Sequence, residues 1–99
     1  MSFFTTQPEA LSAAATRLAG IGTVMSAQNL AAAAPTTSVL PAGADEVSAL
    51  TATQFAVHAQ MYQAVGAQAE AMHQQLVSTL MASATSYAVT EAANVTAAC

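Results

Sequence analysis

Bulky apolar residues recur at helical spacing through a proline-free stretch of about fifty residues, from Asp45 to Asn94. Intervals that alternate between three and four keep one stripe of a helix facing a partner helix. One row of this stripe holds Phe55, Tyr62, Ala69, Leu76 and Ser83. The companion row, three residues on, holds His58, Val65, Met72 and Thr79. The pattern predicts one long amphipathic helix over about residues 44–95, with a rise of roughly 1.5 Å per residue.

A second stripe of the same kind begins near Pro8 and Glu9. Proline suits the first turn of a helix, where its missing N–H would be unpaired, and glutamate favours the positive helix end. The stripe holds Leu11, Ala14, Leu18, Ile21, Met25, Gln28 and Ala32. It predicts a helix over about residues 8–34, after an irregular arm over residues 1–7 that contains Phe3 and Phe4. Gly20 and Gly22 are expected either to let another backbone approach closely or to give local flexibility.

Residues 35–43 predict a connection, because Pro35 disfavours helical geometry at the residue before it and because Pro41 and Gly43 are typical of turns. Asp45 is expected to cap the second helix by accepting an N–H bond about three residues on. A short connection makes two long helices antiparallel neighbours. The sequence therefore predicts an all-α fold, a two-helix antiparallel hairpin with a longer second helix, in a single domain over residues 1–99.

The unequal helices predict a partner. If Ala34 lies opposite Ala44, Pro8 lies near Glu70, and the rest of the second helix has no helix of its own chain beside it. A large uncovered apolar surface of this kind usually marks a partner site. We expect another helical hairpin to complete a four-helix bundle. The residues expected in the buried seams, within the hairpin or against the partner, are Leu11, Leu18, Ile21, Met25, Phe55, Tyr62, Val65, Met72, Leu76 and Leu80.

Composition changes this picture by what it excludes. Arg17 is the only basic residue against five acidic ones, so binding to nucleic acid or to anionic lipid is disfavoured. Charged residues make up 6 % of the chain, compared with about 25 % in an ordinary soluble domain, which suggests a surface that is largely covered. No basic start of a secretory signal is visible. The single Cys99 is expected to be an exposed terminal thiol.

Several motifs together resemble the mycobacterial PE family. They are Pro8-Glu9, the alanine-rich hairpin, Ala34-Pro35-Thr36-Thr37 before Pro41, and Asp45-Glu46-Val47-Ser48-Ala49-Leu50. The resemblance implies a heterodimer with a PPE-family protein in a four-helix bundle. It also implies recognition of the PPE subunit by a secretion chaperone, export by a type VII secretion system after cytoplasmic assembly, and a place at the cell surface or envelope. Members with long extensions are known, and this chain is expected to carry the PE domain only.

Tyr87 and Glu91 match the Tyr-x-x-x-Asp/Glu export signal of that family. Residues four apart share a helix face, so an aromatic ring and a carboxylate would project together. The alternative is that Tyr87 continues the apolar stripe and Glu91 is a solvated charge. The resemblance favours the export signal.

Enzymatic chemistry finds little support. Glu70 and His73 have the Glu-x-x-His spacing of di-iron bundles, but such a site needs two motifs and two further glutamates. His58 is expected to be a partly buried bundle histidine rather than a catalytic one. No nucleophile motif or phosphate loop is present. We expect no catalytic residue, no metal, no cofactor and no small-molecule substrate, and we keep as alternatives a self-associating structural bundle and an envelope solute-transport complex with a PPE partner.

Overall fold

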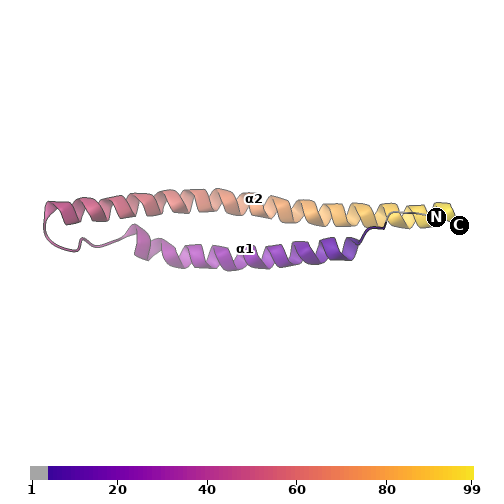
Figure 1. The fold of residues 1–99 in the computed structure, drawn as a ribbon, viewed down its shortest axis with the longest axis horizontal. Helices are drawn as coiled ribbons and strands as arrows, with labels where there is room; N and C mark the ends of the chain where they lie inside the picture. The colour runs from indigo at the N-terminus through magenta and orange to yellow at the C-terminus, as the bar shows by residue number, and fades with distance from the viewer. Residues whose placement is uncertain (1–4) are drawn as a thin grey trace. The chain divides into compact units, whose positions relative to one another are not determined.

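The computed structural model describes residues 5–99 and is all-helical over that range, without a strand. Helix α1 spans Pro8–Thr37 and helix α2 spans Glu46–Ala98, with residues 38–45 connecting them (Figure 1). The two helices have 30 and 53 residues, so the prediction of a longer second helix is confirmed. Phe3 and Phe4 of the predicted N-terminal arm lie outside the described residues.

Helix α1 continues three residues past its predicted end at residue 34, with Pro35 inside it. Pro35 disfavours helical geometry at the residue before it, and this restriction was expected to end the helix. The last turn is instead held by hydroxyl groups, because Thr36 Oγ1 donates to Ala32 O and Thr37 Oγ1 donates to Ala33 O, both at 2.6 Å. Ser38 N–H also donates to Ala34 O at 3.2 Å. These bonds stabilise the turn that contains the proline, and the predicted end was wrong for this reason.

Helix α2 begins at Glu46, two residues after the predicted start, because Asp45 acts as its N-cap. Asp45 Oδ2 accepts from the Ser48 N–H at 3.0 Å and Oδ1 accepts from the Ser48 hydroxyl at 2.8 Å. Both bonds lower the pKa of the Asp45 carboxyl below its ordinary value, and the bond from the Ser48 hydroxyl has the larger effect. The predicted capping role of Asp45 is therefore confirmed. The helix ends at Ala98, beyond the predicted residue 95.

The chain divides into two compact units. We call Thr23–Ala71 the tip unit. The terminal unit consists of two segments, the part of the chain that ends at Gly22 and Met72–Cys99. In each unit a segment of α1 contacts a segment of α2. In the terminal unit Ser12 bonds Met81, and Leu18 bonds His73. Because the residue numbers rise on α1 while those of their partners fall on α2, the two segments run antiparallel.

Small residues form the seam between the helices. Among the described residues those classed as buried are all alanines, Ala15, Ala52, Ala59 and Ala84. The half-buried positions of α2 continue the same seven-residue pattern through Ala56, Gln63, Gly66, Glu70, His73, Val77 and Leu80. Alanine and glycine let two helix backbones approach closely, so the fully buried positions are small and the larger side chains of the seam are only half-buried.

The register between the helices differs from the predicted one. Contact of Leu18 with His73 places Pro8 beside about residue 83 in the terminal unit, rather than beside Glu70. The prediction assumed that the helices face each other from their ends inward. In the tip unit, however, the connection runs along the first turns of α2, where Val39, Leu40 and Ala42 share a groove with Val47 and Thr51. Met72, Leu76, Leu80 and Met81 are therefore not on an overhang, whereas Tyr87 and Val89 are.

Candidate partner interface

Most of the bulky residues predicted to be buried are exposed in the isolated chain. Leu11, Leu18 and Leu80 are half-buried and belong to the hairpin itself. The exposed members are Ile21, Met25, Phe55, Tyr62, Val65, Met72 and Leu76. Their exposed fractions run from 49 % for Leu76 to 69 % for Met72. The structure thus divides the ten predicted seam residues into three that pack within the hairpin and seven that are exposed, a division that the sequence did not give.

The exposed residues of α2 form a flank next to the seam. Phe55 and Tyr62 each lie four residues before a seam position, Ala59 and Gly66, and Val65 and Met72 continue the companion row. Rows at seven-residue spacing stay on one side of a helix that packs in this way. We call this set of exposed residues, the members on α2 together with Ile21 and Met25 of α1, the apolar flank. Each unit carries its own part of the set: Met25, Phe55, Tyr62 and Val65 in the tip unit, and Ile21, Met72 and Leu76 in the terminal unit.

In the tip unit the flank contains a groove of about 380 Å³ between the helices. Its α2 side is lined by Phe55, His58, Ala59 and Tyr62, and its other side by Ala32, Pro35, Thr36 and Val39. A smaller groove of about 210 Å³ adjoins it at Phe55. His58 is exposed at the larger groove in the isolated chain, and its predicted partial burial within a bundle stays a prediction.

A polar cluster crosses between the helices at the edge of the larger groove. The Tyr62 hydroxyl donates to Asn29 Oδ1 at 2.8 Å, and Gln63 Nε2 donates to Asn29 O at 3.0 Å. A Cβ at Gly66 would lie 3.6 Å from Asn29 Nδ2, which is an ordinary van der Waals contact, so the position of the Asn29 amide does not require glycine there. The cluster ties the Tyr62 ring to α1 and fixes the register of the tip unit.

A second side chain crosses between the helices in the terminal unit. His73 Nε2 lies within hydrogen-bonding distance of Leu18 O, and because a carbonyl oxygen only accepts, Nε2 carries the proton. The imidazole lies over Gly22, where a Cβ would meet His73 Cδ2 at 2.7 Å. Gly22 therefore admits a side chain of the other helix rather than its backbone. A Cβ at Gly20 would meet nothing within 4 Å, so the expected close approach is absent there.

The metal motif does not assemble into a site in the described residues. Glu70 and His73 are both half-buried in the seam, with His73 directed at Leu18 O. No group of three or more His, Cys, Asp or Glu residues in residues 5–99 could hold a metal ion.

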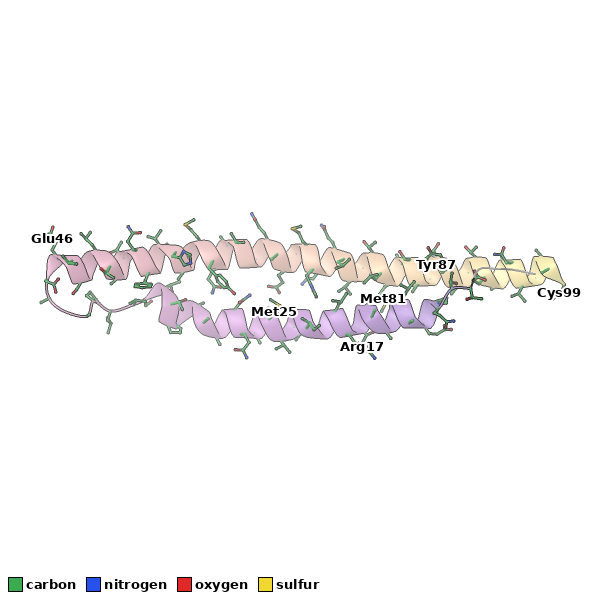
Figure 2. The ribbon with its side chains drawn as sticks, in the orientation of Figure 1. Arg17, Met25, Glu46, Met81, Tyr87 and Cys99 are labelled. Carbon is green, nitrogen blue, oxygen red and sulfur yellow. The ribbon has the colours of Figure 1, made fainter. Side chains whose placement is uncertain are left out.

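Tyr87 and Glu91 lie on α2 beyond the position of Pro8 in the terminal-unit register. Figure 2 labels Tyr87 on this part of α2. Tyr87 is 48 % exposed and Glu91 is half-buried. The α1 segment of the same unit begins near them, with Pro8 as first helical residue and Glu9 in the first turn. Gln7 O accepts the N–H bonds of Ala10 and Leu11 there, at 3.0 and 3.2 Å.

Neither helix of the described range has the length and hydropathy that a bilayer span requires.

Sequence reasoning missed the seam and its two crossing groups. Ala52, Ala59, Gly66 and His73 recur at intervals of seven, and this small-residue row is a readable signal for close helix packing. The bulkier rows next to it dominated the pattern instead. The partners of Asn29 and His73 depend on the register, which sequence alone did not fix.

The fold and the apolar flank define a helical hairpin with more apolar surface than it covers itself. The chain belongs to the PE family, whose model matches residues 4–94. It is 60 % identical over 98 residues to PE family protein PE13 of Mycobacterium tuberculosis H37Rv, covering 99 % of each chain. It is 55 % identical to PE8 of the same strain and 58 % identical to PE_PGRS33 of strain CDC 1551. It spans only 36 % and 20 % of those two proteins. These relatives carry no enzyme names, and nothing in the described residues indicates catalysis.

Proposed function

We propose that this chain is the PE subunit of a heterodimer with a PPE-family protein, exported by a type VII secretion system. The partner supplies the remaining helices of a four-helix bundle. The pair assembles in the cytoplasm, with a secretion chaperone bound to the PPE subunit, and acts at the cell surface or envelope.

The apolar flank is the observation that carries this proposal. Its residues are about half exposed or more in the isolated chain, although burying one of them would contribute about 1.5–3 kcal/mol. A monomer that leaves such side chains in water gives up most of that stabilisation, and long helices depend on tertiary packing. A helical partner on the flank supplies the missing packing.

The flank is also uncharged, which bears on the kind of partner. Its members on both helices are aliphatic, aromatic or methionine side chains, and the only basic residue of the chain, Arg17, points away from α2 (Figure 2). Such a surface suits a protein helix and offers no cations to phosphates of nucleic acid or lipid headgroups.

Tyr87 and Glu91 are the proposed export signal. They are four apart on α2, beyond the start of α1, so a bundle formed over the flank leaves them open to the secretion machinery. Pro8 and Glu9 begin α1 and serve the fold rather than recognition.

A second copy of the chain is the main rival to the PPE partner, since two hairpins also make four helices. Expression distinguishes the two. The proposal expects aggregation of the chain alone and a soluble one-to-one complex when a PPE-family chain from the same host is co-expressed. A soluble, cooperatively unfolding homodimer of the chain alone would contradict it. Solute transport by the pair is a further role that the complex could serve in the envelope, tested by uptake in a host that lacks the gene for this chain.

A further inference from the structure

The larger groove has the geometry of a hole in knobs-into-holes packing. Its α2 lining, Phe55, His58, Ala59 and Tyr62, follows the spacing i, i+3, i+4 and i+7. Four residues at this spacing form the hole that receives one side chain of a facing helix in a coiled coil. The opposite lining repeats the spacing with Ala32, Pro35, Thr36 and Val39, the last just beyond α1.

The smaller groove repeats the pattern one heptad earlier. Its α2 lining includes Ser48, Thr51, Ala52 and Phe55, again at i, i+3, i+4 and i+7, with Val47 beside them. Phe55 is shared, so the two holes follow each other along α2 at an interval of seven residues. A helix that packs against them presents side chains at the same interval.

The larger hole is held open before any partner arrives. Tyr62, one of its walls, is tied to α1 by its hydroxyl bond to Asn29, and Gln63 bonds the same residue. Ala59 at its floor is 7 % exposed and too small to fill it. Preorganised pockets of this kind are where binding energy concentrates, because little ordering is needed on binding.

The lining restricts what the hole accepts. Its walls are mainly apolar, and the titratable groups among its lining residues are His58 and Tyr62, whose hydroxyl is bonded to Asn29. A charged side chain placed there would lose hydration, and no Asp, Glu, Lys or Arg lines the hole to pair with it. The volume of about 380 Å³ suits a large apolar or aromatic side chain.

We propose that the two holes at Phe55 are the anchor site for the partner, and that they receive two large apolar side chains seven residues apart on one partner helix. The larger of these side chains occupies the hole between Phe55 and Tyr62. This inference rests on the proposed function and adds to it the place and the chemistry of the strongest contact.

The test is a competition between wild-type chain and variant for a limiting amount of the co-expressed PPE-family partner. The two forms of the chain carry different tags, and the ratio recovered with the partner reports their relative affinity. His58→Glu puts a carboxylate in the larger hole, and its recovery should fall at least about 30-fold, as for an interface hot spot. Thr51→Glu should act in the same direction through the smaller hole.

Gln60→Glu is the matched control, because it adds the same charge two residues from His58 at an exposed position outside both holes. It should compete within about threefold of wild type, as expected away from the anchor. Phe55→Ala removes the shared wall and should fail as His58→Glu does, whereas Val57→Ala, also exposed, should not. Helix content by circular dichroism establishes that each variant chain folds in its complex or alone.

The outcomes separate this inference from the proposed function. If the wild-type chain recovers no PPE-family partner, the proposed function is wrong and the anchor assignment fails with it. If wild type binds the partner and His58→Glu competes as well as Gln60→Glu, only the anchor assignment is wrong. If the holes instead control assembly of a homodimer, with His58→Glu dissociating it, the proposed occupant is wrong.

Discussion

The imidazole of His73 lies where a side chain at Gly22 would have to go. A Cβ at Gly22 would approach His73 Cδ2 to 2.7 Å and Nε2 to 2.8 Å, while that Nε2 bonds Leu18 O. Glycine on α1 and histidine on α2 are thus complementary in shape within the terminal unit. This relationship leads to a prediction that separates two neighbouring glycines.

Gly22→Ala should destabilise the protein by about 1–3 kcal/mol, because the new methyl displaces the His73 ring and costs its bond to Leu18 O. Gly20→Ala is the control, since its Cβ meets nothing within 4 Å and alanine favours helix. It should stabilise by about 0.4–1 kcal/mol. Chemical unfolding followed by circular dichroism measures both. Equal effects of the two substitutions would show that His73 does not occupy this position.

Tyr62→Phe should destabilise the tip unit by about 0.5 kcal/mol, at the lower end for a lost hydrogen bond because Tyr62 is half exposed. Tyr87→Phe removes a hydroxyl that makes no hydrogen bond in the described structure and should leave stability unchanged. Unfolding midpoints of the two variants are compared directly. A destabilisation by Tyr87→Phe as large as that by Tyr62→Phe would contradict the bond to Asn29.

The Asp45 cap should make the start of α2 sensitive to acid. Its pKa is lowered in the folded protein by the Ser48 hydroxyl and N–H, so its contribution is present above the unfolded pKa of about 3.9 and is lost as pH falls through the folded pKa. Asp45→Asn keeps a capping amide oxygen but removes the titration. Its thermal midpoint should lie below that of wild type at neutral pH and approach it in acid. Glu46→Gln is the control, since it also removes a charge near the start of α2, but Glu46 does not bond Ser48. This variant should keep the pH dependence of the thermal midpoint.

Tyr87→Ala and Glu91→Ala should each leave the complex with the partner intact and reduce export to background. The reason is that both residues lie beyond the start of α1 and outside the apolar flank, so they contribute to recognition rather than assembly. Immunoblots of culture medium and cell lysate measure the exported fraction, with Thr90→Ala, between the two, as control. Normal secretion of the alanine variants would sink the assignment of the signal.

The purified complex should contain no stoichiometric iron, manganese or zinc. The described residues bring no three candidate ligands together, and Nε2 of His73 is already directed at Leu18 O. Elemental analysis by mass spectrometry checks this. One metal ion per chain, lost in a Glu70→Gln variant, would contradict it.

The existence of the two helices and the cap at Asp45 could be predicted because they depend on local signals: periodicity, the first-turn proline and a capping carboxylate. The end of α1 could not, because the hydroxyls of Thr36 and Thr37 stabilise the turn that Pro35 weakens. The register was also missed, since it depends on how the connection packs along α2. The candidate interface was predicted as a set of rows. Dividing these rows into buried and exposed ones required the structure, which shows that the small residues occupy the buried row.

The alanine seam and the apolar flank use different residues of α2. Residues such as Ala52 and Ala59 hold the hairpin together, while Phe55, Val65 and Met72 of the flank are about 60 to 70 % exposed and contribute little to that packing. In the proposed heterodimer, substitutions on the flank therefore alter the choice of partner, while the alanine seam keeps the fold of the hairpin.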